Sequence, residues 1–320
     1  MGNKILEIMY IAIGLVILFN AIKSFKNKES DARVVTGVFW AILAFTFIFP
    51  NLGIFWGKET LFIPDYVIGY LVVIMALLSL SKKVINNKYS TASAEYISSR
   101  AKKIGSIIFI PAISIGILSF VIYEIQERLV WELGSIGSLG LAILISTILG
   151  LIITKDKPKT ALNEGVRLLD VVGPMSILPQ VLAALGAIFT LSGVGVYISD
   201  TLGLVIPAGN ALIGVIVYCI SMALFTIIMG NGFAAFSVIT TGIGVPFVIM
   251  VGGNPVIVGA LGLTAGYCGT LITPMAANFN IVPTSILEME DRKWGIIKYQ
   301  VPIAVIMLLL HIVLMYLLAF

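Results

Sequence analysis

Charge is the property this chain has least of. Only 11% of its 320 residues are Asp, Glu, Lys or Arg, whereas an ordinary globular protein carries about 25%. Hydrophobic residues make up 59% of the sequence. This composition excludes a soluble globular domain. Apolar runs of roughly the 17–25 residues that cross a bilayer recur along the chain, so the sequence predicts an all-α, polytopic integral membrane protein in a lipid bilayer.

Cysteine and histidine are almost missing too. Cys219 and Cys268 lie far apart without ligand spacing, so we predict packing residues, with neither a disulfide nor a metal site. His311, the only histidine, lies in the last apolar run. A proton relay there is a possible interpretation, although that run contains no carboxylate partner. No pair of Asp, Glu or His falls at membrane depth, which disfavours an intramembrane enzyme, and we expect no catalytic residue.

The few basic residues are unevenly distributed. Fourteen of the 20 Lys and Arg fall in segments 23–33, 82–103 and 155–167, while 50–63 and 124–133 carry one each. Because positive residues accumulate in cytoplasmic loops, the pattern predicts an external N-terminus. The charges orient the protein, and no folded basic face for nucleic acid is expected. The first membrane helices are predicted at 5–22, 34–49, 66–80, 104–123 and 134–154.

Small residues recur in the predicted helix 134–154. Ser138, Ala142, Ser146 and Gly150 repeat every four residues, which places them on one face and allows close contact with another helix. Lipid-facing small residues are the alternative.

Helix breakers divide the chain into two parts. Eight of the 12 Pro residues follow residue 171, and 19 of the 31 Gly residues follow residue 160. Gly and Pro are tolerated at membrane depth where neighbours or bound species satisfy the released backbone groups. We therefore predict scaffold and partner-interface helices in 1–170 and a transport-type domain in 171–320.

The second part has two polar breaks about 40 residues apart, a Gly-Asn-Gly at 230–232 and an amide-rich stretch at 269–283. The run 233–251 between them contains Gly242, Gly244 and Pro246, which predicts a re-entrant hairpin better than a simple span. Asn210, beside Pro207 and Gly209, is expected to bend a helix over 203–228. The last plain helix is predicted at 299–319.

Half-helix ends at such breaks suit anions and Na⁺ without charged side chains. The alternative is that the Asn and Thr residues only cap broken helices and hold them to their neighbours. The predicted substrate or ion contacts are Asn231, Thr270, Thr273, Asn278 and Asn280. The residues predicted to shape the backbone are Gly230, Gly232, Gly269 and Pro274.

These two breaks resemble a pattern of the ion-transporter superfamily, which includes divalent-anion/sodium symporters. That pattern has Ser-Asn-Thr at a hairpin tip and Thr-Pro-Pro-Asn-Ala at a helix break. Residues 230–235 are similar to the first and 271–278 to the second. Gly replaces both hydroxyl residues beside Asn231, and two residues are added between Pro274 and Asn278. These departures weaken the sodium site more than the fold.

A longer resemblance, densest at 273–283, is to a family of bacterial membrane subunits described as part of a two-subunit 5-oxoproline (pyroglutamate) transporter. It implies a secondary transporter in the bacterial cytoplasmic (inner) membrane, a second integral membrane subunit and uptake of a small carboxylate, with Na⁺ as a possible coupling ion. Residues 1–170 contain no second hairpin and broken helix, which a partner could supply. The rival interpretation is a structural subunit that stabilises a separate permease without contacting substrate.

Overall fold

The computed structural model describes the chain apart from residues 1, 29, 57–62, 82–83, 85–92, 130–132, 205–208, 288 and 292. Every regular element in this described part is helical. Within the described residues, seven helices are long and apolar enough to cross a membrane: Lys4–Lys26, Arg33–Gly53, Glu95–Gln126, Gly134–Thr154, Ala211–Met229, Gly232–Ile249 and Ile297–Ala319. The chain is a multi-pass membrane protein, as its composition predicts.

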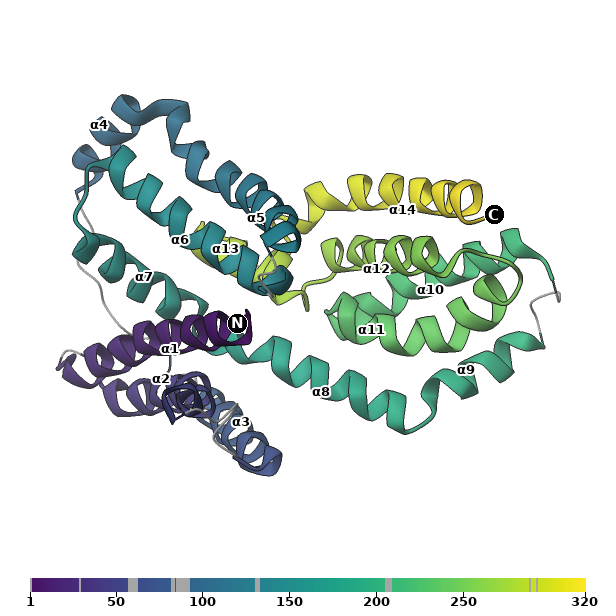
Figure 1. Ribbon diagram of the computed structural model, residues 1–320, viewed down its shortest axis with the longest axis horizontal. Coiled ribbons are helices and arrows are strands. Elements are labelled where there is room, and N and C mark those ends of the chain that lie inside the picture. The colour runs from purple at the N-terminus through teal and green to yellow at the C-terminus, as the bar shows by residue number, and fades with distance from the viewer. Residues whose placement is uncertain are drawn as a thin grey trace. The chain divides into compact units, whose positions relative to one another are not determined.

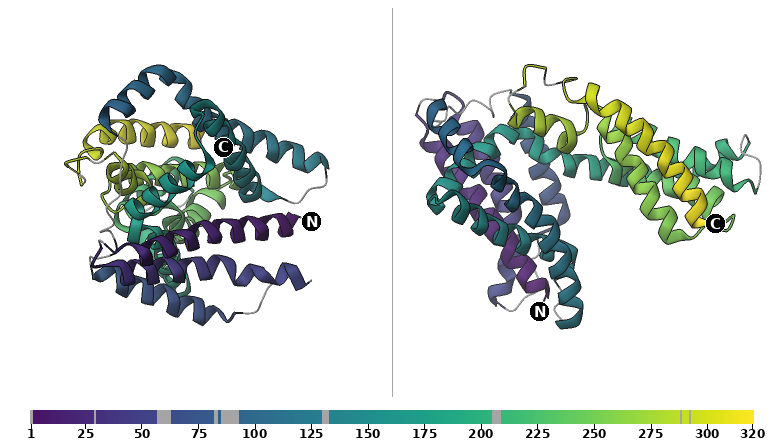
Figure 2. Two further views of the ribbon diagram at one scale, coloured as in Figure 1. Left: turned by 90° about the vertical axis from the view of Figure 1, so that its left-hand side faces the viewer. Right: turned by 90° about the horizontal axis from the view of Figure 1, so that it is seen from above.

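The chain forms two compact units, residues 1–173 and 174–320. The elements of the first unit are α1 (Gly2–Lys26), α2 (Arg33–Ile48), η1 (Pro50–Trp56), α3 (Asp65–Leu80), α4 (Ala94–Ile104), η2 (Gly105–Ile108), α5 (Phe109–Leu129), α6 (Gly134–Thr154) and α7 (Pro158–Val172). Helices α1 and α2 pack side by side, and so do α5 and α6 (Figures 1 and 2).

The small residues of α6 serve helix contact, as predicted. Ser138, Ala142 and Ser146 are buried, and the Ser146 and Ser114 hydroxyl oxygens lie 2.7 Å apart across α6 and α5. A Cβ added at Gly150 would lie 3.7 Å from Pro111 Cγ. Small side chains thus bring the two helices into contact over this face.

A buried polar pair joins α1 to α7. Asn20 Nδ2 donates to Asp170 Oδ1 at 3.0 Å, and both side chains are buried. Nearer the basic end of α1, Lys23 Nζ donates to Asn163 Oδ1 at 2.5 Å. Helix α7 therefore contacts α1 through the polar side chains of Asn163 and Asp170.

The second unit follows η3 (Gly173–Ile177). It comprises α8 (Leu178–Leu191), α9 (Val194–Gly203), α10 (Ala211–Met229), α11 (Gly232–Ile239), the π-helix η4 (Thr240–Ile249), α12 (Pro255–Leu271), the short π-helix η5 (Ala277–Ile281), α13 (Val282–Ile286) and α14 (Ile297–Ala319). Helices α10, α11 and α12 contact one another, and α14 covers α12 and α10 (Figure 1).

Tyr218 is at the centre of this second unit and is fully buried. Its ring lies against two glycines that have no side chain to obstruct it, Gly244 of η4 and Gly262 of α12. Its hydroxyl oxygen is 2.7 Å from Thr240 Oγ1. One tyrosine of α10 thus contacts both η4 and α12.

Hydrogen bonds to Asp291, in the polar segment before α14, hold the start of that helix. Asp291 accepts hydrogen bonds from the Trp294 backbone N–H at 2.9 Å and from Lys298 Nζ at 3.2 Å. These donors, the Trp294 N–H first, lower the pKa of the exposed Asp291 carboxyl below its usual value.

Two local expectations were wrong. The chain does not turn back at Gly242, Gly244 and Pro246, because η4 continues α11 with wider π turns and the two together reach span length. Pro246 has no backbone N–H that a wider turn could leave unpaired. Gly242 is packed against Gly195 of α9. Asn210 does not bend a helix, because it precedes α10 and caps it by accepting from the Ile213 N–H at 3.1 Å.

Candidate functional site

The first polar break forms the tip of a helical hairpin. Helix α10 ends at Met229 and is followed by Gly230, whose φ of +69° is a conformation that favours glycine. Asn231 then caps α11, because its Oδ1 accepts from the N–H groups of Phe233 at 2.8 Å and Ala234 at 3.4 Å. The tip therefore joins the carbonyl end of α10 to the N–H end of α11.

The second break interrupts the helix that follows α11 and η4. Helix α12 ends at Leu271, and helical structure resumes at Ala277 in η5. Asn280, only 1% exposed, donates from Nδ2 to the carbonyls of Thr270 at 2.9 Å and Thr273 at 2.7 Å. The side chain thus satisfies the Thr270 carbonyl at the end of the interrupted helix and shares the Thr273 carbonyl with the Ala276 N–H at 3.3 Å.

The two breaks meet in space. Thr273 Oγ1 donates to the Ile227 carbonyl near the end of α10 at 2.8 Å. A Cβ on Gly230 would lie 2.5 Å from the Met275 carbonyl oxygen, so only glycine permits this approach. Residues 46 positions apart therefore form one polar junction.

A cavity of about 160 Å³ lies at this junction. It is lined by Leu182, Gly230, Asn231, Gly232, Phe233, Tyr267, Thr270, Ala277 and Phe279. None of these side chains is charged. Three of them form a row of rings, with Phe233 and Tyr267 centroids 6.0 Å apart and Tyr267 and Phe279 centroids 5.8 Å apart. We call this space the junction cavity.

The predicted site residues occupy different places at the junction. Asn231, Thr270, Gly230 and Gly232 line the junction cavity. Thr273 and Asn280 are not among its lining residues and hold the break together through the hydrogen bonds described above. Gly269 packs on α10, where an added Cβ would lie 2.2 Å from the Ala223 carbonyl oxygen. Pro274 lies within the break, and the side chain of Asn278 is outside the part that the structure describes.

The three aromatic residues of the junction cavity were not predicted. Each looks like an ordinary apolar membrane residue in the sequence, and only the fold shows that Phe233, Tyr267 and Phe279 come together. A usable signal was their placement, because Tyr267 and Phe279 flank the second break and Phe233 follows the first.

Comparison with known proteins identifies the family. Residues 7–320 match the family model described as "Protein of unknown function (DUF979)". The chain belongs to the DUF979 family. No curated protein matches this DUF979 sequence.

One solved structure is similar to the DUF979 chain, the YdaH transporter of Alcanivorax borkumensis, whose topology is described as unusual. The two share 13% sequence identity, and the alignment covers 99% of this chain and 84% of the transporter with a TM-score of 0.36. A TM-score of this size does not establish a common fold.

Two buried oxygens near the junction of the DUF979 protein have no hydrogen-bond partner. One is Asn280 Oδ1, and the other is Oγ1 of Thr226, a residue with no exposed surface. Thr226 precedes Ile227, the residue that binds Thr273. A buried polar atom without a partner is costly, and neither residue is among those that line the junction cavity.

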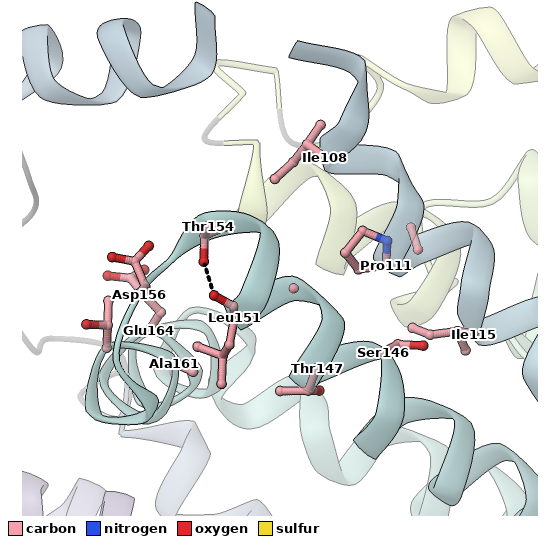
Figure 3. Close-up of a pocket in the computed structure, with 13 residues that line it drawn as sticks. Ile108, Pro111, Ile115, Ser146, Thr147, Leu151, Thr154, Asp156, Ala161 and Glu164 are labelled. Atoms are coloured by element: carbon pink, nitrogen blue, oxygen red, sulfur yellow. Dashed lines mark hydrogen bonds between the residues drawn. The ribbon is translucent and has the colours of Figure 1, made fainter. Parts of the chain in front are cut away.

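A second, larger cavity of about 520 Å³ lies in unit 1–173 of the DUF979 protein (Figure 3). Pro111 and Ile115 line one end, and Asp156 and Glu164 lie at the other (Figure 3). The acidic groups already have basic partners, since Asp156 lies 3.6 Å from Arg100 and Glu164 lies 2.7 Å from Arg167. The junction cavity, which combines two helix breaks and unpaired oxygens nearby, is the better candidate site.

Proposed function

We propose that this protein is one subunit of a secondary transporter that takes up a small carboxylate, 5-oxoproline above others, across the bacterial cytoplasmic (inner) membrane. The observation that carries the proposal is the junction cavity, where two polar breaks far apart in sequence meet at the ends of apolar helices. Backbone irregularity at membrane depth is tolerated where it faces protein or lines a cavity.

The lining of the junction cavity suits a compact anion with an apolar face. Helix α11 starts at the cavity, and the partial positive charge of a helix N-terminus favours a carboxylate there. The rings of Phe233, Tyr267 and Phe279 offer apolar surface. 5-Oxoproline carries one carboxylate and one amide on a five-membered ring, so it presents both features in a small volume.

Na⁺ is the proposed coupling ion. Unwound carbonyls and half-helix ends bind Na⁺ in broken-helix transporters, and the unpaired Asn280 Oδ1 and Thr226 Oγ1 are oxygen donors of the right kind. Together with Thr270, Thr273 and Asn278, these residues are the proposed substrate or ion contacts. A bound Na⁺ would supply positive charge beside the anion and link uptake to the sodium gradient.

A second integral membrane subunit completes the proposed transporter. Carriers of this type use two inverted copies of a hairpin and a broken helix, and the described part of this chain offers one pair of polar breaks for such a copy, at 230–232 and 269–283. Residues 171–320 would then form the transport domain, and residues 1–170 would serve as scaffold and partner interface.

The competing proposal is a structural subunit that never contacts substrate. It is favoured if Asn231 and Asn280 act only within the fold, since both make hydrogen bonds that stabilise helix ends. An enzymatic function is a weaker proposal, because no Asp, Glu, His or Lys is found among the described residues that line the junction cavity.

Uptake of radiolabelled 5-oxoproline into membrane vesicles tests the proposal. The vesicles contain this chain, the candidate partner, or both, with and without a sodium gradient. We expect uptake with both chains and a sodium gradient only. Uptake that needs only the partner would support the structural role, and no uptake with both chains inserted would refute the substrate.

Variants at Asn231 separate substrate contact from helix capping. Serine also caps helices well, so Asn231→Ser preserves the cap and removes the amide, whereas Asn231→Ala removes both. We expect both variants to assemble and to lose uptake. Normal uptake by Asn231→Ser would show that the residue acts only as a cap.

A further inference from the structure

His311 is buried in α14, with 7% of its surface exposed. Helix α14 packs against α12 and α10, and the yellow α14 runs beside the green helices in Figure 2. Helices α10 and α12 contain no Asp, Glu, Lys or Arg. The titratable side chains of the three helices besides His311 are Tyr218, Cys219, Tyr267, Cys268, Lys298, Tyr299 and Tyr316. Only histidine among these side chains ordinarily titrates near neutral pH.

The hydrogen bonds of His311 accommodate both of its charge states. Nδ1 lies 2.6 Å from the Met307 carbonyl oxygen, and since a carbonyl only accepts, Nδ1 carries a proton throughout. Nε2 lies 2.9 Å from Thr264 Oγ1, which is also 2.9 Å from the Ala260 carbonyl oxygen.

The Thr264 hydroxyl has one proton to donate. When His311 is neutral, Thr264 donates to Nε2. When His311 is charged, Nε2–H donates to Thr264, and Thr264 donates to the Ala260 carbonyl. The imidazole keeps a partner on each nitrogen in both states, so a proton can be taken up without leaving either nitrogen unpaired.

The charged state lacks a counterion in these helices. A buried cation is costly unless it is paired, and α12 also lines the junction cavity, through Tyr267 and Thr270. Thr270 lines that cavity and lies six residues beyond Thr264, a distance of about 9 Å at 1.5 Å per residue. For two charges about 9 Å apart at an effective dielectric constant of about 20, the anion strengthens proton binding about twenty-fold, and a larger separation of the imidazole from the anion weakens this effect.

We infer that His311 binds a proton together with the anionic substrate, so that the proton and the carboxylate stabilise each other. This inference rests on the proposed function, because it needs a carboxylate in the junction cavity. By reciprocity, protonation of His311 strengthens anion binding by the same factor. The proton would be taken up in addition to the proposed Na⁺.

Histidine NMR tests this inference directly. Because His311 is the only histidine, the chain labelled with ¹³C,¹⁵N-histidine and purified with its partner on a histidine-free tag gives one imidazole titration for this subunit. We expect 5-oxoproline to raise the midpoint by about one pH unit, the counterpart of the twenty-fold effect. An unchanged midpoint, with binding of radiolabelled 5-oxoproline demonstrated in the same sample, would overturn the inference but not the proposed function. Absence of binding would overturn both.

The pH profile of uptake gives a second readout. We expect wild-type uptake to rise as the external pH falls from 8 to 6 and uptake by His311→Gln to be independent of pH over this range, because glutamine does not titrate. Tyr316→Phe on the same helix is the control and should keep the wild-type profile. A purely packing role for His311 would lower uptake equally at every pH, and this result would contradict the inference.

Discussion

Asn280 shows how a single side chain can hold a broken helix open. Its amide nitrogen donates to two carbonyls that continuous helix would have satisfied, those of Thr270 and Thr273. The break therefore has a defined geometry that does not depend on a ligand. Within this side chain only the amide oxygen, Asn280 Oδ1, is left without a hydrogen-bond partner.

Replacement of Asn280 by alanine should destabilise the protein. We expect a cost of about 1–3 kcal/mol because the buried Thr270 carbonyl is left unpaired, with a lower midpoint of thermal unfolding in detergent. Asn254→Ala is a matched control, because Asn254 caps α12 at an exposed turn and its loss should cost only about 1 kcal/mol. Equal midpoints for the two variants would contradict the role given to Asn280.

For single residues, the sequence predicted where the two breaks lie better than what each residue of a break does. The Gly, Pro and Asn residues of both breaks were conspicuous because breakers are rare in apolar helices. What could not be predicted is which carbonyl each side chain reaches, since Asn280 bonds back across seven to ten residues and Thr273 bonds across 46. Thr226 gave no signal at all, because a lone threonine inside a helix is ordinary.

Helix α12 packs on its neighbours through glycine. An added Cβ at Gly269 would lie 2.2 Å from the Ala223 carbonyl oxygen, whereas at Gly259 the nearest atom, Phe236 Cζ, would be 3.8 Å away. The two glycines lie in the same helix, so they have similar backbone propensities and differ in the space around them.

This difference predicts opposite effects of alanine. Gly269→Ala must push α12 away from the backbone of α10, and we expect a loss of about 1–3 kcal/mol or more together with loss of uptake. Gly259→Ala should be neutral or stabilise by up to about 1 kcal/mol, since alanine is the better helix former. The fraction of each variant that remains monodisperse in size-exclusion chromatography after heating measures its stability. A Gly269→Ala protein as stable as the wild type would refute the close packing.

The same glycines explain where prediction of the elements succeeded and failed. Apolar run length was enough to find α6 and α14 nearly to the residue, because a bilayer imposes a length on a span. Gly242 and Gly244 were interpreted as breaks, but in the structure they are contact points for α9 and for Tyr218. A glycine that ends a helix and one that admits a neighbour have the same appearance in sequence.

For the whole molecule, the uneven distribution of basic residues predicts the orientation in the membrane. We expect Lys26→Cys to be labelled by a membrane-impermeant maleimide only from the cytoplasmic side and Asn51→Cys only from outside. The native Cys219 and Cys268 are buried free thiols, so they should add little background. Labelling of both introduced cysteines from the same side would contradict the predicted topology.

Tyr218 has a mechanical consequence for the second unit. Its ring packs between Gly244 and Gly262, and its hydroxyl contacts Thr240. Gly269 brings α12 into direct contact with the backbone of α10. Such interlocked surfaces cannot slide past each other by a fraction of a turn without collision. Any movement that displaces the junction cavity must therefore move α10, η4 and α12 together as one rigid body. The hinges of such a movement must lie outside these three helices.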